Sequence, residues 1–222
     1  MSKHFEVSII KLKKHLFQLS ALVERNLDLA VKAVNEKDVE RAQLVIETDA
    51  LIDQQEVDLE EECLKILALH QPVAHDLRFV VAVLKINNDL ERIGDLSVNM
   101  AERALLLIRT GFPDVKMDFT GMALKVQKMV RDALDALVNE DVDLARAVCV
   151  ADDEVDDMNR AIYEAAKEGI HEYPEHINAF IHLLSVARHL ERSADHATNI
   201  AEDVIYMIEG DIVRHRSDTG EG

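Results

Sequence analysis

The stretch HLERSADHATNIAED, residues 189–203, decides how this chain is expected to fold. It contains no Gly or Pro and is rich in Ala, Leu and Glu, a composition typical of a helix. Its acidic and amide side chains recur every three or four residues, so they lie on one face of that helix. Like charges at this spacing destabilise an isolated helix, so the pattern needs a reason outside the helix. The side chains concerned are Glu191, Asp195, Asn199 and Glu202.

The same polar stripe occurs earlier in the chain, in DLERIGDLSVNMAER, residues 89–103. Aligning residues 85–108 with 185–208 gives eight identities, five of them polar. Apolar positions differ among similar residues, as a core tolerates. The polar positions keep their residue types, which a solvated face does not require. The earlier stripe consists of Glu91, Asp95, Asn99 and Glu102.

The repetition extends along the whole chain. VNEKDVERA at 34–42 resembles VNEDVDLA at 138–145, and Pro72 and Pro174 precede the two stripes at similar distances. Between the prolines the pattern is helical throughout, and two copies of a three-helix unit explain it. We therefore predict an all-α protein of six long helices, roughly 45 Å long at 1.5 Å per residue, forming two repeated three-helix bundles.

The predicted helices span about 5–35, 38–69, 72–108, 118–138, 141–170 and 174–208. Pro72 and Pro174 are expected in the first turn of their helices, where a missing N–H costs nothing. The predicted units are residues 1–112 and 113–210, followed by a frayed tail at 211–222.

Composition and charge exclude several classes of function. The chain of 222 residues is 48% apolar but only 4% aromatic, which is typical of a helical bundle. Its net charge of −18 repels nucleic acid and anionic lipid, so we expect neither as a partner. No segment approaches the roughly 18 uncharged apolar residues that membrane insertion needs. Cys63 and Cys149 stand apart, as reduced thiols of a cytoplasmic protein do.

The spacing of the acidic pairs predicts where they meet. In the first copy the pairs centre on residues 51 and 93, whose midpoint is 72; in the second they centre on 154 and 193, whose midpoint is 173.5. Two antiparallel helices joined by a tight turn at each proline would place these equidistant pairs side by side. Each hairpin should then gather four carboxylates, with an Asn amide one turn away. The predicted clusters are Asp49, Asp53, Glu91 and Asp95 with Asn99, and Asp152, Asp156, Glu191 and Asp195 with Asn199.

Four neighbouring carboxylates are difficult to keep ionised, so either some are protonated or a cation neutralises them. Oxygen ligands suit hard cations such as Mg²⁺, Mn²⁺ and Ca²⁺, or iron, and the charge would accommodate more than one ion per site. Two alternatives remain open. The pairs could be ordinary solvated helix surface, and Arg92 and Arg192 could neutralise the acids in place of a metal.

Two weaker patterns carry expectations of their own. Asp76, in the first turn of the third helix, is expected to form a capping and salt-bridge pair with Arg78. Three histidines at intervals of seven share a face that is rotated by roughly 100° from the acidic stripe, and they are expected to be packing or surface residues. They are His182, His189 and His196.

The segment PVAHDLRFVVAVLKINNDLERIGDLSVNMAE, 72–102, with its echo at 185–202, resembles the PhoU family of bacterial phosphate-transport regulators. The resemblance runs from about residue 5 to residue 210. The four acidic pairs match the E(D)-x-x-x-D motifs of that family, and Pro72 to Arg78 match its P-x-A-x-D-L-R motif. The second copy reads PEHINAF at 174–180 and lacks D-L-R, so a role of Arg78 would belong to one half only.

The resemblance implies more than the residues themselves indicate. It implies two three-helix bundles that bind metal, often multinuclear, through the acidic motifs, with iron, zinc, manganese or magnesium as candidates. It also implies a cytoplasmic protein without a catalytic reaction, often a homodimer. Such a protein links a high-affinity phosphate ABC transporter to a sensor histidine kinase and represses the phosphate-starvation response when phosphate is plentiful.

Two other functions fit the same residues. A metal-dependent hydrolase or oxidase could use these carboxylates to activate water or oxygen. The long helices suggest no pocket, general base or lid for such an enzyme, and a deep cleft beside Asp195 would favour it. The chain could also be a structural helical adaptor without metal.

Overall fold

The computed structural model describes residues 3–111, 115 and 117–210, and within these residues it contains helices and no strands. The all-α prediction is therefore confirmed. The tail at 211–222 and the loop around Pro113, where the two predicted units meet, lie outside the described residues. The elements are α1 (Lys3–Glu36), α2 (Val39–His70), α3 (Ala74–Thr110), α4 (Phe119–Asn139), α5 (Val142–Glu172), a short 3-10 helix (Pro174–His176) and α6 (Ile177–Glu209).

The helices α2 and α5 begin in the same way. Asp38 precedes α2 and accepts a hydrogen bond from the backbone N–H of Arg41; Asp141 precedes α5 and accepts one from Leu144. These caps satisfy an N–H that has no partner within the helix. Each capping aspartate also donates its own N–H to the carbonyl five residues earlier, at 3.1 and 3.0 Å. The repeated sequence thus produces the same tight turn in both halves.

The two proline turns differ. The prediction that Pro72 occupies the first turn of a helix is wrong, because α3 begins only at Ala74, after the N-cap Val73. The reversal occurs earlier, at Gln71, which ends α2 in the left-handed conformation with φ of 46°. Pro72 therefore lies between the helices. Pro174 does begin a helical turn, the 3-10 helix that leads into α6.

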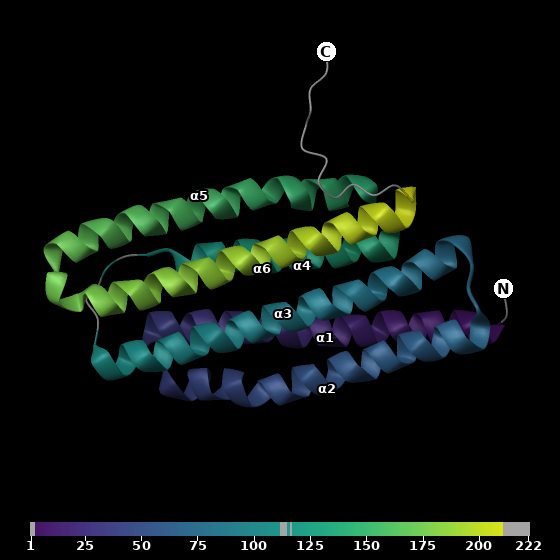
Figure 1. Ribbon diagram of the computed structural model, residues 1–222, viewed down its shortest axis with the longest axis horizontal. Helices are drawn as coiled ribbons and strands as arrows, with labels where there is room; N and C mark the ends of the chain where they lie inside the picture. Colours follow the sequence, from purple (N-terminus) through teal and green to yellow (C-terminus); the bar gives the residue numbers. More distant parts are fainter. Residues whose placement is uncertain (1–2, 112–114, 116, 211–222) are drawn as a thin grey trace, which may run out of the picture.

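Four helices form one layer in the order α2, α3, α6, α5, and α1 and α4 lie behind it (Figure 1). The helix α1 packs on α2 and α3, and α4 packs on α5 and α6, so each repeat is a three-helix bundle. The antiparallel pair α3 and α6 joins the repeats, with a smaller contact between α1 and α4. The two hairpins predicted to carry the acidic clusters, α2–α3 and α5–α6, therefore form the two sides of one layer.

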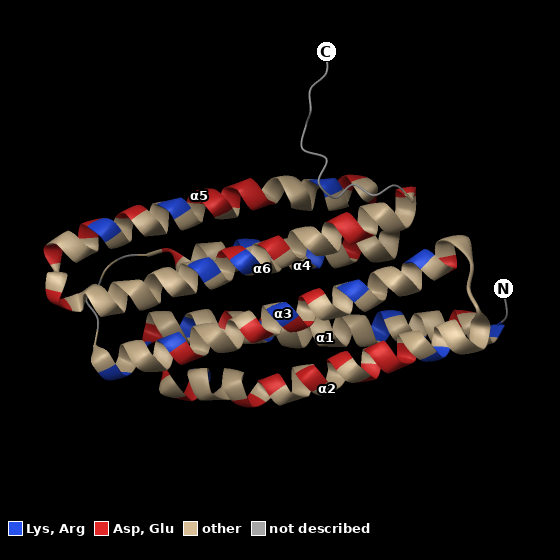
Figure 2. Ribbon diagram, viewed as in Figure 1, with Lys and Arg blue, Asp and Glu red and all other residues tan. Residues whose placement is uncertain are grey.

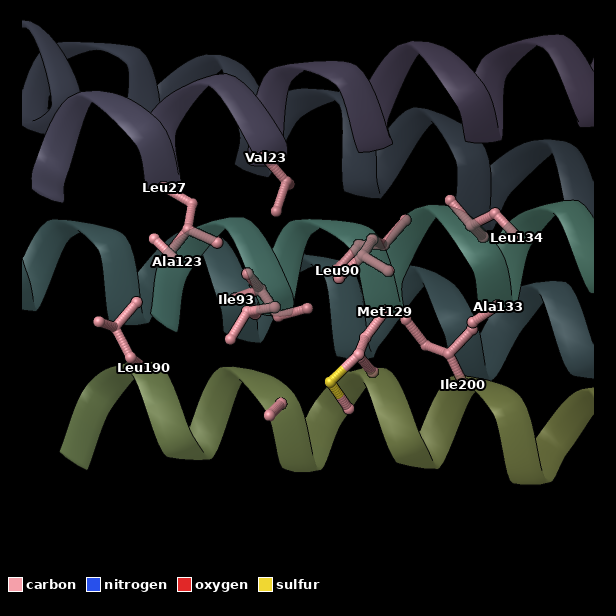
Figure 3. Packing of buried hydrophobic residues seen from close by; sticks show 14 of the residues in the cluster. Val23, Leu27, Leu90, Ile93, Ala123, Met129, Ala133, Leu134, Leu190 and Ile200 are labelled. Atoms are coloured by element: carbon pink, nitrogen blue, oxygen red, sulfur yellow. The ribbon is translucent and has the colours of Figure 1, made fainter. Parts of the chain in front are cut away.

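The interior is a continuous aliphatic cluster that both repeats share. Figure 3 shows side chains of α1, α3, α4 and α6 pointing toward a common centre. Leu90 and Ile93 of α3 and Leu190 and Ile200 of α6 are fully buried there. At about 25 cal/mol per Å² of buried apolar surface, this cluster is the main source of stability. It holds α3 against α6 and so sets the position of each hairpin.

Candidate metal sites

The α2–α3 hairpin brings the first acidic pairs together. The pKa of Asp49 on α2 is raised by burial and then by the charges of Asp53 and of Asp95, which lies on α3. The pKa of Glu91 is raised by burial, by Asp95 and also by Asp53 across the hairpin. These carboxylates interact through their charges because the chain reverses between the two helices. Asp53 is exposed, and the other three are partly buried.

The α5–α6 hairpin crowds its acids more strongly. Burial, followed by the charges of Asp195 and Asp156, raises the pKa of Asp152 to about 6. The pKa values of Glu191 and Asp195 are raised by burial first, and the charge of Asp156 raises both further. A cation would stabilise the charged form of carboxyl groups whose pKa is raised by burial and by neighbouring acids.

Arginines neutralise part of this negative charge. This agrees with the alternative that Arg92 and Arg192 act on the acids in place of a metal. The Arg92 guanidinium lies 3.1 Å from the Asp95 carboxylate and 3.6 Å from that of Glu91. Arg192, at the equivalent place on α6, lowers the pKa values of Glu191 and Asp195, but less than burial raises them. Because these pairs are partly exposed, each contributes little stability, about 0–1 kcal/mol.

The two asparagines are placed less simply. A spacing of four residues advances a helix by slightly more than one turn, so the stripe rotates gradually around α6. By Asn199 it has turned toward α3, and the Asn199 amide lies 3.5 Å from the Asp89 carboxylate there. Asn199 is therefore at the contact between the repeats. Asn99, its equivalent on α3, is partly buried.

Within residues 3–111, 115 and 117–210, no group of three or more His, Cys, Asp or Glu side chains is arranged to hold a metal ion. The donor chemistry nevertheless fits a hard cation, because each hairpin offers only oxygen ligands whose charges repel one another. Asp95 is turned toward Arg92, so binding at the first hairpin would require Arg92 to release it. The ligand role of the ten predicted residues stays a prediction.

Glu56 is an acidic residue that the sequence interpretation missed. It lies on α2, its carboxylate accepts a hydrogen bond from Asn87 at 3.1 Å, and its charge raises the pKa of Glu91. Its spacing of three from Asp53 places it on the same side of α2, so helical periodicity could have identified it. Acidic residues are abundant along the layer, particularly on α2 and α5, which made a single extra Glu inconspicuous (Figure 2).

The contact between α3 and α6 contains polar pairs that the sequence did not indicate. The Lys85 amine lies 3.0 Å from the Asp203 carboxylate, and the His196 ring lies 2.8 Å from the Asp89 carboxylate. His196 is thus a packing residue with a polar partner. Instead of pairing with Asp76, as predicted, Arg78 donates a hydrogen bond to the carbonyl of Met207 at 2.8 Å. The family resemblance implied that Arg78 has a role in the first repeat only. In the structure, its hydrogen bond to Met207 joins the first repeat to the second.

A surface hollow of about 700 Å³ opens beside Asp195. The enzymatic alternative predicts a deep cleft at this position. The hollow carries polar and charged groups from both α5 and α6. They include Asn159, Tyr163, Ser185, Arg188, Glu191, Arg192 and Asp195.

The sequence matches a family model described as the PhoU domain twice, over residues 16–104 and 119–204. A PhoU homolog of Pseudomonas aeruginosa, named as a phosphate-specific transport system accessory protein, is 38% identical over 216 residues. That alignment covers 97% of this chain and 89% of the relative. A homolog of the same name from Aquifex aeolicus is 41% identical over 206 residues and 92% of each chain.

Solved structures agree with these sequence matches. The crystal structure of PhoU from Pseudomonas aeruginosa superposes with a TM-score of 0.87 at 38% identity, covering 93% of this chain and all of that one. The phosphate transport system regulatory protein PhoU from Streptococcus pneumoniae gives a TM-score of 0.84 at 30% identity, over 94% and 99% of the two chains. In the part of the chain that is described, no helix is long and apolar enough to cross a membrane.

Proposed function

Because the chain belongs to the PhoU family, whose domain it carries twice, we propose that it is a regulatory accessory protein of phosphate transport that binds cations and catalyses no reaction. The observation that carries this proposal is the match of both repeats to one family, with relatives named for the phosphate-specific transport system. The acidic pairs occupy equivalent places in the two repeats, so the cation sites would also be duplicated.

The finer role follows from what the family resemblance implies. We propose that the chain acts in the cytoplasm, as a homodimer, between a phosphate ABC transporter and a sensor histidine kinase. In that position it would repress the phosphate-starvation response while phosphate is abundant. The test is a strain lacking the gene, carrying a phosphate-starvation reporter and complemented with this chain. Reporter activity that stays high in abundant phosphate after complementation would contradict the proposal.

Cation binding would act through the hairpins. A bound divalent or multinuclear centre of iron, zinc, manganese or magnesium would supply positive charge between facing carboxylates. Asp49 and Asp53 on α2 would then be held toward Glu91 and Asp95 on α3, instead of being repelled. The equivalent pairs would do the same for α5 and α6. The layer formed by these helices would thereby keep one shape for partner proteins to recognise.

Thermal unfolding tests the cation sites. A ligand at 100 times its Kd stabilises the folded state by about 2.7 kcal/mol, so added Mn²⁺ should raise the Tm of chelator-treated protein. A variant with Glu91→Gln, Asp95→Asn, Glu191→Gln and Asp195→Asn should lose this shift while remaining folded. The absence of any shift with Mn²⁺, Mg²⁺, Zn²⁺ or iron would contradict the proposed sites.

The hollow beside Asp195 favours a second candidate, a metal-dependent hydrolase or oxidase that uses the same carboxylates. Its carboxylates would hold a metal that activates water or oxygen, and its arginines would orient an anionic substrate. The decisive assay is hydrolysis of a phosphomonoester, and oxygen consumption, by metal-loaded protein and by its Asp195→Asn variant. A turnover that the variant loses would replace the regulatory proposal with an enzymatic one.

A further inference from the structure

Glu56 differs from most acidic residues of α2 because a buried side chain holds it. Asn87 on α3 is 1% exposed, and its amide nitrogen donates to the Glu56 carboxylate at 3.1 Å and to the Glu56 carbonyl at 2.9 Å. An exposed glutamate usually moves among several rotamers, and fixing one costs entropy. Here Asn87 has already oriented the carboxylate across the α2–α3 hairpin.

Asn87 also presents an acceptor that has no use within the fold. Among the described residues, its carbonyl oxygen Oδ1 is buried and has no hydrogen-bond partner. A buried polar atom without a partner is unusual in a folded protein and points to an absent water or ion. This oxygen belongs to the same amide group whose nitrogen donates to the Glu56 carboxylate.

Glu56 lies about one helical turn from the first acidic cluster on both helices, because it follows Asp53 by three residues on α2 and its partner Asn87 precedes Glu91 by four on α3. Its charge acts on Glu91, and the charge of Asp53 acts on Glu56 itself. The first hairpin therefore gathers five carboxylates: Asp49, Asp53, Glu56, Glu91 and Asp95.

The second hairpin has a different set at the equivalent positions. The offset that relates Asp53 to Asp156 relates Glu56 to Asn159, and the offset that relates Glu91 to Glu191 relates Asn87 to Ala187. Glu56 and its holder are thus both without an equivalent on α5 and α6. The charge of Asp153 also acts on Asp152 there, but Asp153 is exposed and directly follows Asp152, so it lies about 100° around α5 from the acidic stripe. Arg188 adds positive charge there and lowers the pKa of Glu191, whereas its equivalent on α3 is the neutral Asn88.

We propose that Glu56, oriented by Asn87, is a fifth cation ligand of the α2–α3 site, and that this site binds divalent cations more tightly than the α5–α6 site. The proposal rests on the cation binding proposed above. The number of charged oxygen ligands and the rigidity of a site both increase its affinity for a hard cation. On the facing stripes of the two helices, the first site has one carboxylate more than the second, and it also has a preoriented ligand and one arginine fewer. The protein would therefore fill its two sites in order as the cation concentration rises.

Titration of the full chain with Mn²⁺ tests the order of filling. After removal of metals with EDTA, free Mn²⁺ is followed by electron paramagnetic resonance and the heat of binding by calorimetry. The unmodified chain should show a tighter and a weaker class of sites. Glu56→Gln should weaken only the tighter class, by about tenfold, the scale of losing one supporting group at a metal site. The matched variant Asn159→Glu should strengthen only the weaker class.

The outcomes separate this inference from the proposed function. If the unmodified chain binds no Mn²⁺, this inference fails, and if it also binds no Mg²⁺, Zn²⁺ or iron, the proposed cation sites fail with it. If it binds Mn²⁺ and Glu56→Gln leaves both classes unchanged, cation binding stands and the role of Glu56 is wrong. Asn87→Ala provides a further check, because a positioning role predicts a weaker first class and an unchanged second class. A merely structural role would lower the Tm of the metal-free protein and leave both Kd values as they were.

Discussion

The four acidic pairs occupy equivalent positions in the two hairpins, whereas the polar residues at the contact between the hairpins do not. One half of the α3–α6 contact contains opposite charges: Lys85 lies 3.0 Å from Asp203, and His196 lies 2.8 Å from Asp89. Because α3 and α6 are antiparallel copies of each other, a symmetric sequence would form each pair twice. In the other half of the contact the sequence differs, and neither of these pairs is repeated.

The equivalent positions carry a different set of side chains. Ser185 and Arg103 replace Lys85 and Asp203, while His189 and Leu96 replace Asp89 and His196. Both ring nitrogens of His189 are buried without a hydrogen-bond partner in the described chain. Burial, and then the charge of Arg103, lower the pKa of His189 to about 4.

The comparison separates two demands on a duplicated chain. The hairpin faces keep their acids in both copies, and our proposal attributes this to a shared cation chemistry. The contact needs only enough favourable pairing to hold the halves together, and pairing in one half supplies it. The asymmetry therefore locates polar stabilisation at the Lys85 end of the contact, and substitutions at equivalent positions should have unequal effects.

The largest difference in the free energy of unfolding is expected between a substitution of Lys85 and one of its equivalent, Ser185. Lys85→Ala removes the ion pair that Lys85 forms with Asp203, whose side chain is only 2% exposed. Breaking a buried ion pair costs about 3–5 kcal/mol, and the partial exposure of Lys85 places this case near about 3 kcal/mol. Urea unfolding measures the loss. Ser185→Ala, at the equivalent position, should change stability by less than about 0.5 kcal/mol.

A double variant checks the cause of that loss. If the loss of the Lys85 charge beside the buried Asp203 carboxylate is responsible, Asp203→Asn in the Lys85→Ala background should recover much of the stability. Equal losses from Lys85→Ala and Ser185→Ala would show that the contact is energetically symmetric and would contradict the comparison.

The two hairpins should also differ at their glycines. A Cβ on Gly169 of α5 would lie 2.4 Å from the ring of Phe180, which is fully buried on α6. Gly169→Ala should therefore destabilise by about 2 kcal/mol, because overpacking outweighs the gain in helix propensity. Gly94→Ala on α3 would meet Ile52 at 3.3 Å, and the equivalent residue of α6 is already alanine. We expect the free energy of unfolding of Gly94→Ala, measured by thermal unfolding, to stay within about 1 kcal/mol of the parent value.

Helical periodicity and the repeat predicted most of this architecture. The acids of each hairpin are neighbours because their distances from the turn are equal, and such distances can be counted in a sequence. The start of α3 was predicted two residues too early, at Pro72 instead of Ala74, because Gln71 ends α2 in a left-handed conformation that its residue type does not favour. Glutamine gives no signal for this backbone geometry.

The polar pairs between α3 and α6 could not be predicted. Which residues of two long helices meet depends on their relative rotation and shift, and packing of the aliphatic interior sets both. Lys85 and Asp203 are separated by 118 positions, and no local pattern relates them. The role of Asn87 was hidden for the same reason, since a buried amide in a helical sequence is informative only when its partner is known.

His189 and His196 should respond to substitution with opposite signs. His189→Leu removes ring nitrogens that are buried without partners, so we expect a gain of about 1 kcal/mol at pH 7. His196→Leu removes the partner of Asp89 and should destabilise. The pKa of His189 is about 4 in the folded chain and has its ordinary value of 6.5 in the unfolded chain. As the pH falls below 6.5 the unfolded chain therefore binds a proton at His189 that the folded chain does not, so the free energy of unfolding decreases until the pH reaches about 4. Urea unfolding at pH 7 and pH 5 should therefore show a larger advantage for His189→Leu at pH 5.

The smallest expected effect distinguishes the two acidic clusters in metal-free protein. The folded pKa of Asp152, about 6, lies above its ordinary value of 3.8. Its protonated form therefore contributes stability below pH 3.8, and this contribution is lost as pH rises through 6. Asp152→Asn should remove that dependence and stabilise the protein at pH 7 by about 0.5 kcal/mol, a value kept small because solvent screens a partly exposed group.

Urea midpoints of the Asp152→Asn variant, measured with a chelator present, should show its advantage shrinking between pH 7 and pH 4. Asp49→Asn, the equivalent change in the first hairpin, should also raise the urea midpoint at pH 7 by an amount that shrinks toward pH 4, and this increase should be smaller than that of Asp152→Asn. The pKa of Asp49 is also raised mainly by burial, but fewer neighbouring acids act on it. A loss of stability at pH 7 in Asp152→Asn would mean that its charge is favourably paired in the folded chain. The crowding of acids that motivates a cation at the second hairpin would then be absent.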